Sequence, residues 1–267
     1  MSDDPNRENE TLTPLPDPGD ESQSQPPEIR VPVARVAVRL PGGPPFVTYS
    51  IIGLTVVVYL FQMLSTFVLG GDLPLALGAK INEYMLDGQW WRFITPVLLH
   101  GSVLHIGVNM YSLYAIGPQL EPFYGHWRFL ALYLLTAFTG VVLSFALSDG
   151  ASVGASTAIF GLLGALGVFA YLNRGVFGQR AQLLLRNVVQ VAVINLIIGL
   201  TPGIDNWGHA GGLVGGVLLA WLGGPEFRLA GEPPELRLEN QRSNGVFAMS
   251  ALGVFILFAA IAIFVMI

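Results

Sequence analysis

The amino-acid sequence predicts an all-α, polytopic membrane protein. Hydrophobic residues make up 52% of the chain and charged residues only 12%, whereas a soluble domain usually carries about 25% charged residues. Several apolar runs reach the roughly 20 residues that a helix needs to cross the hydrocarbon core of a bilayer. Cysteine is absent, so we expect no disulfide framework and no thiol chemistry. No basic tract indicates a nucleic acid as partner.

A tail followed by seven membrane-spanning helices is the expected organisation. Residues 1–45 are rich in Pro, Asp, Glu, Asn and Ser and lack apolar periodicity, which predicts a disordered tail. The apolar runs predict helices at about 47–69, 102–119, 127–148, 155–173, 183–200, 207–223 and 246–267. The chain therefore divides into the tail (1–45), a six-helix core (46–223), a cytoplasmic linker (224–245) and a seventh transmembrane helix (246–267).

The connection between the first two helices is a loop of about 32 residues, a length that usually indicates function or internal structure. It contains "EYMLDGQWWRFITPVLLHG", which mixes aromatic and apolar residues. Trp90 and Trp91 suit the headgroup region of a membrane. We therefore expect part of this loop to lie in the membrane interface.

Positive charges divide unequally between the two sides of the membrane. If the tail lies inside, 11 Arg residues fall on inside segments, and only Lys80 and Arg92 fall outside. Cytoplasmic loops carry such an excess of basic residues. We therefore expect a cytoplasmic N-terminus and an external C-terminus. The simple core and the lack of targeting signals favour a bacterial plasma membrane.

Four polar side chains are expected at one depth in the membrane. The second, fourth and sixth helices all enter from the outer side, so their N-terminal ends lie at a similar level. His105 and Asn109 fall in the first two turns of the second helix, Ser156 in the first turn of the fourth, and His209 in the first turn of the sixth. Ionisable residues inside a membrane are costly and indicate a functional site.

Each of these residues also has a purely structural explanation. Ser156 could cap its helix, and His209 could bond a neighbouring carbonyl. His105 and Asn109 share a helix face and could hold helices together. Together, however, a serine, a histidine and two side-chain donors are the groups that acyl transfer requires as nucleophile, base and oxyanion hole.

Metal binding is the competing chemistry. The four histidines, His100, His105, His126 and His209, are its candidate ligands. His126 is expected on the inner side, and no carboxylate joins the other three. We therefore expect neither a metal nor another cofactor.

Small residues explain how Ser156 and His209 could meet. The sixth helix carries Gly208, Gly212 and Gly216 at four-residue intervals, and a second row at Gly211 and Gly215. Small residues let helix backbones approach closely in lipid. Phe160 lies one turn after Ser156 on the same helix face, where it could support the His209 ring by stacking.

Five sequence features occur in order within roughly residues 47–223, the six-helix core. They are "WWR" at 90–92, "HGSVLHIGVNM" at 100–110, Glu121, "GAS" at 154–156 and "GHAGGLVGG" at 208–216. Together they resemble the motifs of the rhomboid intramembrane serine proteases.

The resemblance implies a role for each matching residue. Ser156 is implied as the nucleophile and His209 as the general base. His105 and Asn109 are implied as the side chains of the oxyanion hole, together with the backbone N–H of Ser156.

Other matching residues are implied to have structural roles. Trp91 and Arg92 correspond to a structural pair in the long first loop, and Glu121, Gly212 and Gly216 to helix-packing positions. The substrates implied are transmembrane segments of other proteins, cut near the outer face of the bilayer. Helix five and the loop after it are the implied entry side for substrate, and the seventh helix suggests a "six plus one" arrangement.

One position departs from the family pattern, which usually has glycine after the serine. Thr157 stands there in this chain, and its β-branched side chain is bulkier and stiffer than glycine. We expect Thr157 to alter the detailed geometry around Ser156 and the rate of the reaction, but not the class of reaction. Asp205, one turn before His209, could be a third member of the site or the cap of its helix.

Two further functions fit parts of the sequence. A non-proteolytic rhomboid-like binder of membrane proteins, or quality-control adaptor, would use the same helix packing but leave Ser156 and His209 without a task. A transporter would require polar groups on both sides of the midplane and internal repeats, which the sequence does not show. The oligomeric state and the identity of the substrate do not follow from the sequence.

Overall fold

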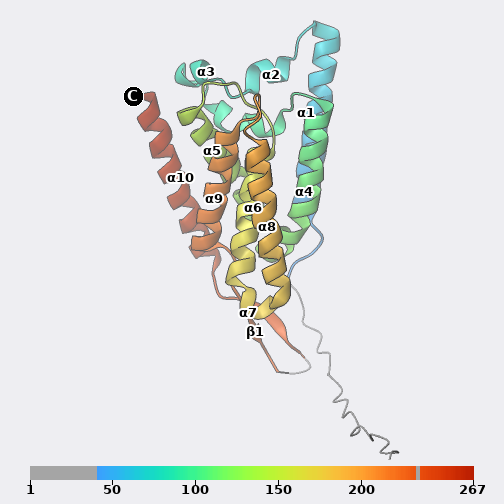
Figure 1. Ribbon diagram of the computed structural model, residues 1–267, viewed down its shortest axis with the longest axis vertical. Coiled ribbons are helices and arrows are strands. Elements are labelled where there is room, and N and C mark those ends of the chain that lie inside the picture. The colour runs from blue at the N-terminus through green and yellow to red at the C-terminus, as the bar shows by residue number, and fades with distance from the viewer. Residues whose placement is uncertain (1–40, 233–234) are drawn as a thin grey trace, which may run out of the picture. The chain divides into compact units, whose positions relative to one another are not determined.

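The computed structural model describes residues 41–232 and 235–267, which form a bundle of long helices (Figure 1). The disordered tail predicted for residues 1–45 lies mostly outside the described residues. The long helices are α1 (Phe46–Leu69), α4 (Val103–Tyr124), α5 (His126–Leu147), α6 (Ser156–Leu172), α8 (Gln179–Ile198), α9 (Asn206–Gly223) and α10 (Asn244–Met266). Each coincides with one of the seven predicted apolar runs.

The prediction of an all-α, polytopic membrane protein is confirmed. By length and composition, four helices of the described chain can cross a membrane, namely α1, α5, α8 and α10, and α6 is a shorter apolar helix. Polar residues in α4 and the many glycines of α9 lower the hydropathy of these two helices. The count of seven spans therefore stays a prediction.

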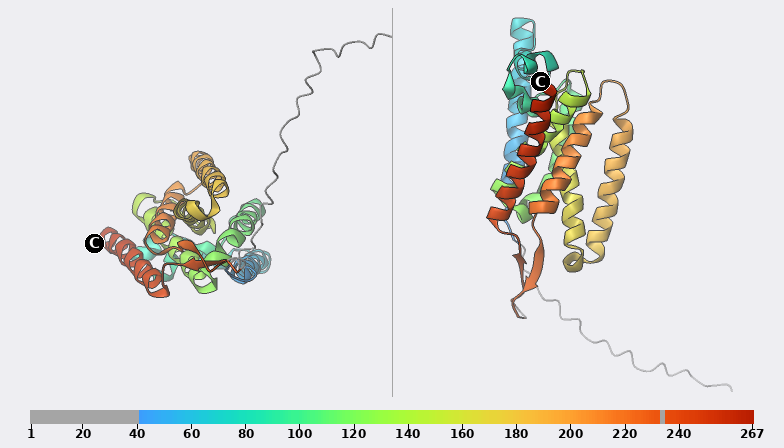
Figure 2. Two further views of the ribbon diagram at one scale, coloured as in Figure 1. Left: turned by 90° about the horizontal axis from the view of Figure 1, so that it is seen from below. Right: turned by 90° about the vertical axis from the view of Figure 1, so that its left-hand side faces the viewer.

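Helix α6 lies at the centre of the bundle. Every residue from Thr157 to Ala170 is buried, and α6 packs against α4, α5, α8 and α9. By contrast, α1, α8 and α10 bury only a few residues each and lie at the outside (Figure 2). The first turn of α6, where Ser156 lies, is therefore held from several sides.

The two glycine rows of α9 face two different neighbours. A Cβ on Gly212 would lie 1.9 Å from the Thr157 carbonyl oxygen of α6, and one on Gly216 would lie 2.0 Å from that of Gly161. In the other row, a Cβ on Gly215 would lie 2.1 Å from Oγ1 of Thr139 on α5. Since no side chain fits at these positions, glycine lets α9 approach both α6 and α5 at backbone distance.

The long first loop has its own structure, as expected. It forms α2 (Leu73–Gly78), α3 (Asn82–Leu86) and the 3₁₀ helices η1 (Trp90–Phe93) and η2 (Thr95–Leu98). The buried guanidinium of Arg92 donates hydrogen bonds to the carbonyls of Ala76 (2.8 Å) and Ala79 (2.6 Å), and Nε1 of Trp91 donates to Leu77 (2.8 Å). These carbonyls lie at and just after the C-terminal end of α2, where helix carbonyls lack partners. Arg92 and Trp91 thus fasten the loop.

A carboxylate on α4 fixes the start of α1. Buried Glu121 accepts hydrogen bonds from the backbone N–H groups of Val47 (2.7 Å) and Thr48 (2.8 Å) and from the Thr48 hydroxyl (2.6 Å). Its other contact is with Nδ1 of His126, at 2.6 Å. The N-cap residue Pro45 provides no side-chain hydrogen bond. Glu121 therefore supplies from another helix the negative charge that stabilises a helix N-terminus.

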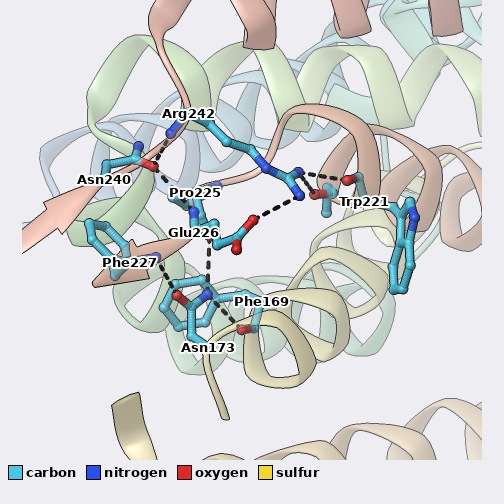
Figure 3. A network of polar contacts seen from close by, with 9 residues as sticks. Phe169, Asn173, Trp221, Pro225, Glu226, Phe227, Asn240 and Arg242 are labelled. Carbon is cyan, nitrogen blue, oxygen red and sulfur yellow. Dashed lines mark hydrogen bonds and ion pairs between the residues drawn. The ribbon is translucent and has the colours of Figure 1, made fainter. Parts of the chain in front are cut away.

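The predicted linker contains a β-hairpin that sequence analysis did not predict. Strand β1 (Phe227–Ala230) pairs antiparallel with β2 (Arg237–Asn240). Asn173, which ends α6, donates to the Pro225 carbonyl (3.1 Å) and accepts from Phe227 N–H (2.7 Å) (Figure 3). Arg242 donates to the carbonyl of Trp221 (2.6 Å) and pairs with Glu226 (3.2 Å).

The start of α10 is bound to the core by α5. The guanidinium of Arg128 donates to the side chain of Asn244 and to the carbonyl of Arg242. The hairpin and this arginine together connect α10 to the ends of α5, α6 and α9. Helix α10 itself packs against α5 and α9.

Candidate active site

Ser156 is the first residue of α6. Its N-cap neighbour Ala155 provides no side-chain hydrogen bond, so Ser156 lies among the unpaired N–H groups of a helix start. Ser156 is partly exposed, whereas Ala155 and Thr157 on either side are buried. The positive end of the helix dipole therefore lies at an accessible hydroxyl.

His209 on α9 contacts this hydroxyl. Its Nε2 lies 2.9 Å from Oγ of Ser156, within the roughly 2.6–3.2 Å over which a nucleophile and its base form a hydrogen bond. The imidazole ring stacks on Phe160, with ring centroids 4.3 Å apart and planes inclined by 11°. Phe160 therefore lies where it can support the His209 ring by stacking.

Asp205 does not complete a triad with His209. Its Oδ1 accepts a hydrogen bond from Gly208 N–H (2.9 Å), which makes it the N-cap of α9. Within the described chain, Nδ1 of His209 is buried and has no hydrogen-bond partner. The contact of Ser156 with His209 therefore includes no hydrogen bond from Asp205 to the imidazole.

His105 lies beside Ser156, against Gly154. A Cβ on Gly154 would lie 2.7 Å from Nε2 of His105 and 3.6 Å from Oγ of Ser156, and the φ of Gly154 is +128°. Only glycine suits both the space and the backbone conformation. Nδ1 of His105 accepts a long hydrogen bond from Gly101 N–H (3.4 Å). In a neutral ring this leaves the hydrogen on Nε2, the nitrogen that faces Gly154.

Asn109 lies one turn further along α4 and is buried. Its Nδ2 donates to the carbonyl of His105 (2.9 Å). A side-chain amide carries two N–H donors, so a second hydrogen remains for another acceptor. The structure brings His105, Asn109, Ser156 and His209 to the walls of one cleft.

This cleft has a volume of about 460 Å³ and runs between α4, α6 and α8. Its size is typical of sites that enclose a ligand, roughly 300–1,000 Å³. Apart from the polar groups named above, its lining is largely apolar: Val108 and Ile116 of α4, Ile159 and Leu163 of α6, and Val191 and Ile198 of α8. A polar end and an apolar length fit a ligand that is itself partly embedded in lipid.

Three residues that sequence reasoning missed position the loop before Ser156. His100, given no role beyond a candidate metal ligand and the first residue of a motif, is 1% exposed, and its Nε2 accepts a hydrogen bond from Ala155 N–H (3.4 Å). Gln62 of α1 binds the backbone of His100 from both sides, accepting from its N–H (3.0 Å) and donating to its carbonyl (3.2 Å). The signal available in the sequence was a glutamine, Gln62, within the first apolar helix.

Lys80 is the third missed residue. It is fully buried, and its Nζ donates to the carbonyls of Ser148 (2.6 Å) and Gly150 (2.9 Å). Its backbone pairs in both directions with Ser152. Burial lowers the pKa of the Lys80 ammonium.

Burial, with the neighbouring His105 as a second cause, lowers the pKa of His100 to about 4. The ring is therefore neutral near pH 7, and a neutral ring nitrogen can accept the Ala155 hydrogen bond. Across the described residues, no group of three or more His, Asp and Glu side chains is suited to a metal ion. His126 lies with Glu121, away from the other histidines.

The fold and this site define a class of protein, namely a helical membrane protein with a serine and a histidine in contact at the mouth of a cleft between its helices. Residues 87–226 match the Rhomboid domain. The chain belongs to the rhomboid family, as the sequence motifs indicated.

Curated relatives support this assignment. Rhomboid protease GluP of Bacillus subtilis is 38% identical over 179 residues, which cover 67% of this chain and 35% of the relative. RHOMBOID-like protein 5 of Arabidopsis thaliana is 36% identical over 160 residues, 58% of this chain and 51% of the relative. Rhomboid-type serine protease 2 of Emericella nidulans is 35% identical over 144 residues, 53% of this chain and 28% of the relative. The chain thus spans between about a quarter and a half of the length of these relatives.

Proposed function

We propose that this protein is an intramembrane serine endopeptidase that cleaves transmembrane segments of other membrane proteins. The observation that carries the proposal is the 2.9 Å contact between Ser156 Oγ and His209 Nε2 at the wall of a largely apolar cleft. Relatives named as rhomboid proteases support the same reaction class. The reaction requires no cofactor.

In the proposed reaction, Nε2 of His209 takes the proton of the Ser156 hydroxyl as Oγ attacks the carbonyl carbon of the substrate. The tetrahedral intermediate collapses when the C–N bond breaks and His209 returns the proton to the leaving amine. An acyl-enzyme ester on Ser156 remains. His209 then deprotonates a water that attacks the ester, and the serine hydroxyl re-forms.

Three donors are proposed to stabilise the oxyanion of the intermediate. They are Nε2–H of His105, the free amide hydrogen of Asn109 and the backbone N–H of Ser156 at the start of α6. Such hydrogen-bond donors point at the negative charge that develops in the transition state. In a site shielded from water they usually make the largest single contribution to the rate enhancement of acyl transfer.

The cut is proposed to lie near the outer end of the substrate's transmembrane segment. Ser156 lies at the opposite end of α6 from the arginine-rich hairpin side, which the sequence predicts to be cytoplasmic. Unwinding a helix in the middle of the bilayer would leave backbone groups unpaired at several kcal/mol each. Cleavage near the interface avoids much of that cost, because water and polar enzyme groups can pair with the unwound backbone.

Purified protein incubated with a panel of labelled transmembrane segments tests the proposal. We expect cleavage by the wild type and by Ser250→Ala, whose serine lies on α10 away from the cleft. Ser156→Ala should bind segments but not cut them. If neither the wild type nor Ser250→Ala cleaves any segment that the protein binds, the non-proteolytic binder is the correct function.

The proposed orientation, with the N-terminus in the cytoplasm of a bacterium and the C-terminus outside, has a separate test. Because the chain lacks cysteine, single cysteines can be labelled without background. A membrane-impermeant maleimide applied to intact cells should label Thr201→Cys, between α8 and α9, and not Arg228→Cys on β1. The reverse labelling pattern would show the opposite orientation.

A further inference from the structure

A second cavity lies at the arginine-rich end of the bundle, away from Ser156. Its volume is about 200 Å³. One wall is the C-terminal part of α4, with Gln119 and Phe123, and the floor is α6, with Phe169. The other wall comes from α7 (Arg174–Phe177) and the first turns of α8, with Phe177, Arg180 and Ala181.

The interior of this cavity is aromatic and apolar. Phe123 contacts Phe169, with ring centroids 4.8 Å apart, and Phe177, at 5.8 Å. Ala181 is buried and lines the cavity, and its side chain is small. Gln119 and Arg180 are exposed and form the rim. The cavity thus combines an apolar interior with one positive charge at its mouth.

The rim of the cavity belongs to a basic stretch of the chain. Between Asp149 and Asp205 the chain contains Arg174, Arg180 and Arg186 and no acidic residue. Arg174 stacks on Tyr171 and donates to its carbonyl. Within the described ranges, Arg180 forms no ion pair. An anion is therefore the complementary partner for Arg180.

The cavity lies between α4 and α8, two helices that pack on α6 and make little contact with each other. Helix α8 packs mainly against α6, and only Ala181, Val188 and Ala192 of α8 are buried. The cavity between the ends of α4 and α8 has Gln119 and Arg180, both exposed, at its rim. A molecule that enters from there must carry a hydrocarbon part for the phenylalanines and a negative group for Arg180.

We propose that this cavity binds one anionic phospholipid, with an acyl chain among Phe123, Phe169 and Phe177 and the phosphate on Arg180. Guanidinium groups bind phosphate oxygens in a bidentate manner, and anionic lipids are enriched in the cytoplasmic leaflet, on which side the sequence predicts Arg180 to lie. The bound lipid fills the space between α4 and α8 and braces α8. This site shares no residue with the cleft beside Ser156 and does not depend on the proposed proteolysis.

Native mass spectrometry of the full chain in detergent tests the lipid site. Delipidated protein is titrated with phosphatidylglycerol or phosphatidylcholine. We expect one tightly bound phosphatidylglycerol and weaker binding of phosphatidylcholine. Arg180→Gln should weaken phosphatidylglycerol binding about fivefold, the effect of one basic residue near an anionic lipid surface.

Arg186→Gln is the matched control, because Arg186 is an exposed arginine of the same helix that does not line the cavity. It should leave phosphatidylglycerol binding unchanged. Ala181→Phe fills the cavity and should reduce the binding of both lipids. Equal loss in Arg180→Gln and Arg186→Gln, or equal affinity of the wild type for the two lipids, would overturn the proposal. The comparison of the two arginine variants decides the question even if Ala181→Phe does not fold.

Discussion

Thr157 of α6 and Gly140 of α5 share one space. A Cβ on Gly140 would lie 2.6 Å from Cβ of Thr157 and 3.0 Å from its Cγ2. Thr157 is the residue that departs from the family's usual glycine after the serine. A glycine on the facing helix accommodates the larger side chain, so the turn at Ser156 keeps its contact with His209.

This relationship predicts an energetic coupling between the two positions. Gly140→Ala should destabilise the protein by about 1–3 kcal/mol, as overpacking does, and Thr157→Gly in the same chain should restore part of that loss. Rescue will be partial because the Gly208 carbonyl oxygen is also only 2.7 Å from the added Cβ. A double-mutant cycle of unfolding free energies measures the coupling, and strict additivity of the two changes would contradict it.

Asn109→Ala should lower the rate of the chemical step. Loss of one donor in an oxyanion hole costs about 2.7–4 kcal/mol of transition-state stabilisation, so kcat should fall by a factor of about 10²–10³. Steady-state cleavage of a labelled segment gives kcat. Asn187→Ala, the same change at an exposed position of α8, should leave kcat unaltered. An Asn109→Ala protein with unchanged kcat/KM would remove this residue from the site.

Asp205→Asn should retain most of the activity. Asp205 makes no hydrogen bond to His209, and asparagine caps a helix about as well as aspartate. In an enzyme with a true triad, the corresponding change lowers kcat by about 10⁴. We expect a change of less than about tenfold in kcat. A loss near the triad value would show that the carboxylate acts through His209.

The free energy of unfolding should decrease as the pH is lowered from about 6.5 to about 4. In this range His100 is neutral in the folded protein and protonated in the unfolded chain. Its folded pKa of about 4 lies below the ordinary value of 6.5. Between these values the unfolded chain binds the proton and the folded chain does not, so unfolding becomes more favourable as pH falls. Thermal unfolding midpoints from pH 7 to pH 4 measure this slope. His100→Gln, which keeps a hydrogen-bond acceptor, should make the slope shallower, and an unchanged slope would contradict the assignment.

The stability of the substrate helix should control the cleavage rate. Helix-weakening Gly or Pro below the cut favours unwinding, since Pro removes a backbone donor and strains the preceding turn. Replacing these residues by Leu, with the cut sequence kept, should slow cleavage. A small residue just before the scissile bond should also favour cleavage, because Ala155 and Thr157 crowd the approach to Ser156. If stable Leu helices are cut as fast as the parent, helix instability does not control the rate.

Sequence periodicity predicted the seven long helices closely, because apolar runs ended by polar or glycine-rich segments are the strongest signal available. The contact between Ser156 and His209 could be predicted because both residues begin helices that enter from the same side. The glycine rows of α9 then indicated a close helix approach. These inferences need only spacing and residue type.

The supporting residues could not be predicted in the same way. Gln62, Lys80 and His100 bond to backbone atoms between 38 and 70 positions away in the chain, and a backbone acceptor leaves no mark in the sequence. The hairpin of β1 and β2 was missed for a related reason. Its strands are too short to show a clear alternation of apolar and polar residues. Asn173, which forms a hydrogen bond to it, lies at the end of α6.

Helix α10 has a consequence for how such a protein can evolve. It packs on α5 and α9 and contributes no residue to the cleft, whereas α4 and α8 line the cleft. A substitution on α10 reaches Ser156 only through α5 or α9. Selection for a new substrate would therefore change α4 and α8, while α10 is free to drift with the thickness and composition of the host membrane.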